Sequence, residues 1–394
     1  MNRQATLALL LSVGVVGPAG AREDDCDPST VTRSVIAVTS NRHAVDSSGR
    51  LIGSPPVNTW DIYLLDADAL DENGPLPVVQ HVSGTDSDSA PALSSDGKGT
   101  IVFDSNRNRG QGPLNTAHLF LMNADGSDQR PLTKGSSATW SPSGKRIAFH
   151  ASASGTGLPV KTDPGAPTTD SVIFVAKVRD LLKGRAPHAI THPRPDDPET
   201  PEVDEAQIDD DADWSPTGNK IVFTRKNRTE PDQTNPASAE IYVVKANGKG
   251  LRCLTCPPPD SEEEREPEEE RSPAWSPDGE RIVYSCRKGT QGGNTLEICV
   301  MNADGTNVVT LTDNAVADLS PHWLPDGRIV FQRPLPNPPM GQGQQVWVMN
   351  SVRDAHGSVP AADQLTDLPG ANMFPSWGRI RACVEEDDDE DDDN

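Results

Sequence analysis

Residues 273–289 read PAWSPDGERIVYSCRKG, and this stretch decides the fold because it recurs along the chain. The other versions are APALSSDGKGTIVFDSNR (90–107), ATWSPSGKRIAFHAS (138–152), DADWSPTGNKIVFTRKNR (211–228) and PHWLPDGRIVFQRP (321–334). Each is followed by a second half, of which LEICVMNADGTNVVTLT (296–312) is the clearest. Self-similarity at a regular spacing is the signature of a repeat architecture.

Each unit predicts four short strands. A Trp-containing strand meets a Pro-x-Gly turn, an apolar β-branched strand follows, a loop leads to a third strand, and an Asp-Gly or Asn-Gly turn leads to a fourth strand ending in Leu-Thr. Four such strands form one propeller blade. The turn glycines are 47, 74, 61 and 48 residues apart, so the period of about 47 is typical of a β-propeller and the two long intervals hold insertions.

A sixth unit is split between the chain ends. Residues 34–42 match the second strand, 60–68 the third and 77–83 the fourth, whereas the Trp strand of this unit is found at 373–380. We therefore predict an all-β fold, a closed six-bladed propeller of four-stranded antiparallel blades over residues 34–380. Its first blade is closed by the C-terminal strand, which leaves no open sheet edge.

The first 21 residues resemble a secretory signal peptide, with one Arg before an apolar run and a small-x-small end. No later run is apolar for 18 residues, so no transmembrane segment is predicted. We expect a periplasmic or extracellular protein. Residues 22–33 form a lead, and the acidic residues 381–394 are expected to be disordered.

The formal charge of −24 is confined to three segments. Residues 196–213, 260–271 and 385–393 contribute −10, −6 and −9, and the rest of the chain sums to about +1. These segments are interpreted as solvated acidic insertions and a tail. Because no basic patch is present, nucleic acid is not an expected partner.

Six cysteines in an exported chain favour disulfides over a metal cluster. Two of them fall on neighbouring strands of one unit, two flank the split unit and would close the ring, and the remaining two pair by default. The predicted pairs are Cys286–Cys299, Cys26–Cys383 and Cys253–Cys256.

Three motifs allow a binding or a structural interpretation. The Asn-Ala-Asp-Gly segments at 123–126 and 302–305 could hold calcium, but they lack the full ligand series and a hairpin turn is favoured. The recurring Trp side chains could stack on a ligand, but packing between blades is favoured. Four histidines could converge on a metal, but none recurs between repeats, so no cofactor is expected. The residues concerned are Trp140, Trp214, Trp275, Trp323, Trp377, His81, His118, His150 and His322.

The segments SPDGERIVYS, SPTGNKIVFT and SPSGKRIAFH, with the MNADGT and MNADGS turns, resemble the propeller repeats of the TolB family over residues 31–380. That resemblance implies a periplasmic propeller that binds a partner across its central opening. A counterpart of the family's N-terminal α/β domain is not expected here. Related propellers also precede peptidase domains, but no Gly-x-Ser-x-Gly elbow occurs in this sequence.

We predict a monomeric, non-catalytic scaffold that binds an envelope protein or a glycan. Loops between second and third strands and the acidic insertions emerge on one face, and the candidate binding residues there are Asn41, Arg42, Asn106, Arg107, Asn227 and Arg228. The alternative is a propeller enzyme, a metal-assisted lyase or hydrolase with its site at the channel mouth. Three His or carboxylate side chains converging on one point would favour the enzyme.

Overall fold

The structure is a computed structural model. It describes residues 31–40, 60–71, 75–82, 87–94, 96–107, 118–152, 158, 171–192, 207–227, 239–256, 269–287, 295–335, 343–353, 357–367 and 371–382. The predicted signal peptide, most of the acidic insertions and residues 383–394 lie outside these ranges. One compact unit, Thr32–Ala382, contains the sheets. The first strand begins at Val31, three residues before the predicted limit, and the last ends at Ala382, two residues after it.

The described residues form an all-β propeller with two short helical turns, η2 (Ala67–Ala69) and α1 (Val178–Leu181). Four sheets have four strands each. The first contains β24 (Asn372–Ala382), β1 (Val31–Ser40), β2 (Asp61–Asp66) and β3 (Val78–Val82), in that order. The second contains β4 (Asp88–Leu93), β5 (Thr100–Ser105), β6 (His118–Asn123) and β7 (Arg130–Lys134).

The third and fourth sheets follow the same plan with two later repeats. One contains β16 (Glu270–Trp275), β17 (Arg281–Cys286), β18 (Glu297–Asn302) and β19 (Val309–Thr310). The other contains β20 (Leu319–Trp323), β21 (Ile329–Pro334), β22 (Gln344–Met349) and β23 (Ala362–Gln364). Within each sheet neighbouring strands are antiparallel.

The fifth sheet has eight strands and differs from the prediction of six separate blades. It contains β8 (Ser136–Trp140), β9 (Arg146–Ser152), β10 (Ser171–Lys177), β11 (His188–Ala189), β12 (Gln207–Trp214), β13 (Lys220–Asn227), β14 (Ala239–Lys245) and β15 (Arg252–Cys253). Two repeats are joined here because β10 runs parallel to β12 at one residue pair, Ser171 and Ile208. All other pairings within this sheet are antiparallel.

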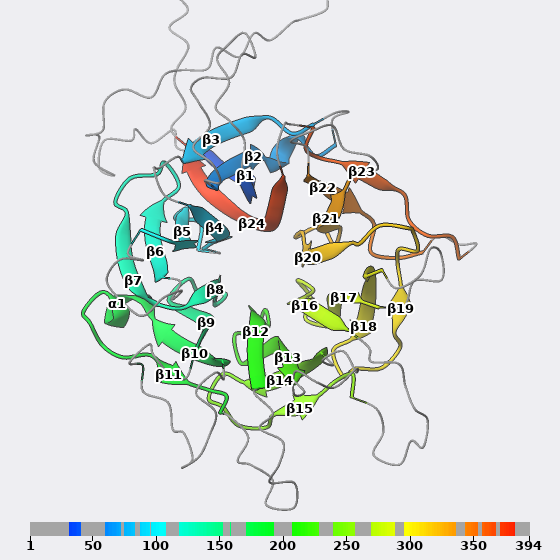
Figure 1. Ribbon diagram of the computed structural model, residues 1–394. Coiled ribbons are helices and arrows are strands. Elements are labelled where there is room, and N and C mark those ends of the chain that lie inside the picture. Colours follow the sequence, from blue (N-terminus) through cyan, green and yellow to red (C-terminus); the bar gives the residue numbers. More distant parts are fainter. Residues whose placement is uncertain are drawn as a thin grey trace, which may run out of the picture. The chain divides into compact units, whose positions relative to one another are not determined.

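The two ends of the described chain meet in one sheet, as predicted. Figure 1 shows β24 beside β1 and β2, where it supplies the strand that the N-terminal unit lacks. The innermost strands contact one another in the cycle β24, β4, β8, β12, β16, β20 and back to β24. Since the last strand contacts both β4 and β20, the cycle is closed.

Apolar side chains from neighbouring sheets form the core. The cluster around Trp140, for example, joins Leu119 of β6 to Phe149 and Phe174 of β9 and β10. The predicted role of the recurring Trp residues in packing is confirmed, because four of them are at most 8% exposed and the fifth is half-buried. The indole N–H of Trp140 donates to the Ala92 carbonyl of the preceding sheet at 3.0 Å.

In four repeats the Leu-Thr or Ile-Thr ending holds the outer strand. In the repeat that ends at Thr312, the Leu311 N–H donates to the Ile298 carbonyl at 2.7 Å, and the Ile298 N–H donates to Thr312 Oγ1 at 2.9 Å. The same hydroxyl contact is made by Thr191, Thr255 and Thr366. A short outer strand is therefore held by a side chain as well as by its ladder.

Candidate binding site on the innermost strands

Each innermost strand contains a bulge residue in the left-handed region, three positions before the Trp or its equivalent. Their φ values lie between 48° and 54°, and the residues are Ala90, Ser137, Asp211, Ser272, Ser320 and Phe374. Positive φ is uncommon outside glycine, and a β-bulge is where strands accommodate it. The pairing register shifts at the bulge in β4, β8, β12, β16 and β20. The bulge is therefore part of the repeat.

A polar side chain from the preceding second strand holds the bulge in four repeats. The N–H of Ser137 donates to Asp104 Oδ1 at 3.0 Å, and the N–H of Phe374 donates to Gln332 Oε1 at 3.1 Å. Thr39 and Thr224 accept in the same way from Ala90 and Ser272, both at 3.1 Å. These bonds run between neighbouring sheets and fix the innermost strands.

The repeat around β12 departs from this pattern. His150 occupies the position of the clamping side chain, and its Nδ1 is buried with no hydrogen-bond partner among the described residues. Burial lowers the pKa of His150, and the carboxylate of Asp211, the bulge residue it faces, opposes that shift.

The sequence QIDDDADW of β12 corrects one prediction. Residues 209–213 were interpreted as part of a solvated acidic insertion, but they form a buried innermost strand. Asp209 is fully buried and accepts two hydrogen bonds from Arg225, at 2.7 and 2.8 Å. Because the adjacent strand β13 supplies cations, the carboxylates can leave water. Asp318 and Arg333 form the equivalent pair, at 2.6 and 2.7 Å.

Asp210 and Asp211 are only partly neutralised. Lys226 Nζ lies 2.5 Å from Asp210 Oδ2, while Asp210 Oδ1 is buried with no partner among the described residues. Burial, followed by the charge of Asp211, raises the pKa of Asp210 to about 7. Asp211 Oδ2 accepts a hydrogen bond from the Ser272 hydroxyl at 3.0 Å. This strand thus holds more acidic side chains than nearby cations.

Asp213 connects three innermost strands. Its carboxylate accepts from the Trp275 N–H at 2.8 Å and from the Thr139 hydroxyl at 3.3 Å. Burial raises the pKa of Asp213, and His322 of β20 opposes that shift. Burial lowers the pKa of His322, and Asp213 opposes that shift in turn. Since β16 lies between β12 and β20 in the cycle, these two groups interact although their strands are not neighbours.

An exposed aromatic residue lies on the opposite side of the cycle. Phe374 of β24, three strands from β12, is 40% exposed and has a φ of 54°. A bulky residue in this region is strained, and such strain is concentrated at functional sites. We call Asp211, Asp213, His322 and Phe374 the axial residues. The sequence analysis did not single out Asp211, Asp213 or Phe374. Asp211 and Phe374 occupy the bulge position, where the other four repeats have Ala or Ser, and Asp213 and His322 occupy the position two residues later, where the other four have Ala, Ser or Thr.

Of the predicted binding-face residues, Arg107 is mostly buried. Its Nη2 lies 2.5 Å from Asp88 Oδ2, and its guanidinium stacks 5.4 Å from the rings of Phe103 and Phe120. Asn106 Oδ1 accepts from the Ser87 N–H at 2.9 Å. This pair therefore anchors the end of β5 to the start of β4. Asn227 ends β13, and Asn41, Arg42 and Arg228 lie outside the described residues.

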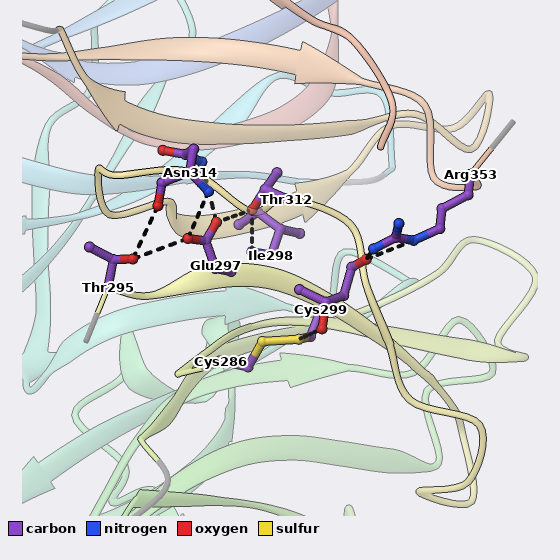
Figure 2. The surroundings of a disulfide bond; sticks show 9 residues. Cys286, Thr295, Glu297, Ile298, Cys299, Thr312, Asn314 and Arg353 are labelled. Atoms are coloured by element: carbon purple, nitrogen blue, oxygen red, sulfur yellow. Dashed lines mark hydrogen bonds between the residues drawn. A yellow bond between two sulfur atoms is a disulfide. The ribbon is translucent and has the colours of Figure 1, made fainter. Parts of the chain in front are cut away.

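Two of the three predicted disulfides are present. The Cα atoms are 5.7 Å apart in Cys253–Cys256 and 5.9 Å apart in Cys286–Cys299. Figure 2 shows the second bond joining β17 to β18, near a buried carboxylate, Glu297, that accepts from Thr312 Oγ1 at 2.7 Å. Burial raises the pKa of Glu297. The third predicted pair, Cys26–Cys383, lies outside the described residues.

The predicted turn at residues 302–305 is confirmed. The Gly305 N–H donates to the Asn302 carbonyl at 2.9 Å, and Asp304 Oδ1 accepts from the Thr306 N–H at 3.0 Å, so the turn itself occupies this carboxylate. Among the described residues, no three His, Cys, Asp or Glu side chains are grouped to hold a metal ion. His81 and His118 belong to β3 and β6, away from the innermost strands.

No described helix has the length and apolar character needed to cross a membrane. No family model matches the sequence, and no curated protein matches it either. Solved structures do resemble it. TolB from Acinetobacter baumannii is 14% identical with a TM-score of 0.56, over 87% of this chain and 66% of that one.

Two further structures show the same fold. A putative TolB from Agrobacterium tumefaciens is 18% identical with a TM-score of 0.51, over 90% of this chain and all of that one. Hydrazine synthase from Kuenenia stuttgartiensis is 16% identical with a TM-score of 0.54, over 90% of this chain but 47% of that one. At these identities the likeness shows a β-propeller fold, which binding proteins and enzymes share.

Proposed function

We propose that this protein is an exported, TolB-like, six-bladed propeller that acts as a non-catalytic scaffold and binds an envelope protein or a glycan through its axial residues. The observation that carries the proposal is the arrangement of these residues. Asp211 and Asp213 lie on one side of the ring and Phe374 on the other, all on strands held by hydrogen bonds to neighbouring sheets. Such a surface offers a partner both charge and an apolar contact.

The count of six blades rests on the strand cycle. Six innermost strands follow one another around the ring, and each begins one repeat of the sequence. The eight-stranded sheet is then two blades that touch through the Ser171 and Ile208 pair. One residue pair is a small fraction of a strand ladder. The cluster of Trp214 packs these two repeats against each other in the same way as the cluster of Trp140 packs two separate sheets.

Export to the periplasm or the exterior is supported by the two disulfides and by the sequence of the first 21 residues. Structural disulfides persist in oxidising compartments. The likeness to TolB propellers is compatible with this location. Fractionation of cells that produce the full chain, followed by detection of the processed protein, tests it directly.

The binding role is tested by partner capture with matched variants. Residues 22–394 serve as bait in envelope extract, and bound proteins and glycans are quantified for the wild type, Asp211→Ala and Phe374→Ala. Asp128→Ala is the control for Asp211, because Asp128 also has positive φ (53°) but lies in the turn between β6 and β7. Val352→Ala, at a residue 61% exposed, is the control for Phe374.

The proposal expects one set of partners that both axial variants lose and both controls retain. Equal capture by all five proteins would contradict a site at the axial residues. Turnover of a chromogenic ester or a polysaccharide that is abolished by His322→Ala would instead support the enzyme alternative.

A further inference from the structure

We propose that the Cys253–Cys256 disulfide is a thiol–disulfide exchange site, reduced and reoxidised by a protein dithiol, whereas Cys286–Cys299 is a structural bond. This inference is independent of the proposed scaffold role. It begins from the Cys-x-x-Cys spacing, which places two sulfur atoms within one turn and is the spacing found at exchange-active dithiols.

The two disulfides differ in access. Cys256 is exposed and Cys253 is half-buried, on β15, the outermost strand of its sheet. By contrast, both Cys286 and Cys299 are fully buried, on β17 and β18 in the middle of theirs. Exchange requires a thiolate to approach a sulfur atom in line with the bond, so only the first disulfide is open to a protein reductant.

The fold around Cys253 does not depend on the disulfide. The N–H of Leu254 donates to the Ile241 carbonyl at 2.8 Å, and the N–H of Ile241 donates to Thr255 Oγ1 at 3.0 Å. These bonds hold β15 against β14 whether or not the sulfur atoms are joined. A disulfide across so few residues also restricts the unfolded chain less than the longer Cys286–Cys299 loop.

The local hydrogen bonds define which sulfur leaves. The N–H of Cys256 lies 2.9 Å from Cys253 Sγ, and a donor at this distance stabilises negative charge on that sulfur. Cys256 Sγ lies 3.4 Å from the Tyr242 hydroxyl. Cys256 is thus the exposed sulfur that an incoming thiolate attacks, and Cys253 is the leaving group.

The exchange balances with a dithiol as reductant. Its first thiolate forms a bond to Cys256 Sγ as the Cys253–Cys256 bond breaks, and the electron pair remains on Cys253 as a thiolate. The second thiol, deprotonated, attacks the reductant's own sulfur in this mixed disulfide and releases Cys256 as a thiolate. Two electrons pass from the dithiol to the protein, the two protons of the dithiol are taken up by the cysteine thiolates, and the reductant leaves as a disulfide.

The test compares the two disulfides within one molecule. Native, oxidised protein is incubated with dithiothreitol or with reduced thioredoxin, quenched with iodoacetamide and mapped by peptide mass spectrometry. We expect Cys253 and Cys256 to be alkylated at a rate proportional to the concentration of either reductant, at least tenfold faster than Cys286 and Cys299, with circular dichroism unchanged. Opening of both disulfides at one rate, or reduction by dithiothreitol but not by thioredoxin, would overturn the proposal.

Single-cysteine variants test the assigned roles. In Cys256→Ser, the Cys253 thiol keeps the main-chain N–H of residue 256 as a hydrogen-bond donor. In Cys253→Ser, the remaining Cys256 thiol does not receive that hydrogen bond. The pH dependence of iodoacetamide alkylation should give a lower thiol pKa for Cys253 than for Cys256. The reverse order would assign attack to the other sulfur and contradict the mechanism.

Discussion

The carboxylate of Asp104, near the end of β5, accepts a hydrogen bond from the N–H of Ser137, the bulge residue of β8, at 3.0 Å. It also accepts one from the Ser136 hydroxyl. Burial raises the pKa of Asp104 to about 7, and these two bonds oppose the rise. A carboxyl group thus joins two sheets at a site where its protonated form is favoured.

We predict that this group makes stability fall as the pH rises. The pKa of Asp104 is about 7 in the folded state against a usual value of 3.8, so the folded state holds the proton more tightly. The favourable contribution is complete below about pH 4 and is lost as the pH rises through 7. Asp104→Asn keeps an acceptor oxygen without the titration. Its free energy of unfolding relative to wild type should therefore increase by roughly 2–4 kcal/mol between pH 4 and pH 8. A difference that stays constant with pH, measured by urea unfolding, would contradict this assignment.

The hydroxyl of Thr224, which holds the bulge of β16, should contribute to stability without titrating. Thr224 is fully buried and its Oγ1 accepts from the Ser272 N–H at 3.1 Å. Thr224→Val keeps the shape and leaves a main-chain donor unsatisfied, at a cost of about 1–3 kcal/mol. Thr217→Val, in the exposed turn after β12, should change stability by less than about 0.5 kcal/mol. Equal melting temperatures for the two variants would show that the clamp is dispensable.

The sequence predicts the repeat, the turns, the Trp packing and both described disulfides, because each depends on a residue type with one strong local preference. The sequence does not predict the bulges, because Ala90, Ser137 and Phe374 share no property that indicates a positive φ. Their conformation is imposed by neighbouring sheets. The two axial residues of β12 were not predicted either, because the DDDADW run has the composition of a solvated segment. Its burial depends on the cations that the neighbouring strand β13 supplies.

The turn glycines differ in what surrounds them, which allows a matched test of contact between sheets. Gly305 and Gly97 have φ values of 86° and 74°, so alanine is strained at both. A Cβ on Gly305 would lie 2.6 Å from the Leu254 carbonyl oxygen of the preceding repeat, whereas Gly97 has open space around it. Gly97→Ala should cost about 1 kcal/mol. Gly305→Ala should cost roughly 1–3 kcal/mol more, by the penalty for overpacking. The measurement is the melting temperature of each variant. Similar melting temperatures would mean that the β18–β19 turn does not pack tightly against Leu254 of the preceding repeat.

Removal of the buried disulfide should weaken the fold more than removal of the exposed one. Cys286 and Cys299 close a loop with a separation of 13 residues, and both are fully buried. A loop of this length restricts the unfolded chain by about 3 kcal/mol, and the shorter Cys253–Cys256 loop by less, near 2 kcal/mol. The double variant Cys286→Ala/Cys299→Ala also loses two buried sulfur atoms from the cluster around Trp275 and Tyr284. Its midpoint in guanidinium chloride should therefore fall further than that of Cys253→Ala/Cys256→Ala. A larger loss in the second variant would mean that the exposed bond holds the outer strand β15, and the interpretation of Thr255 as its anchor would be wrong.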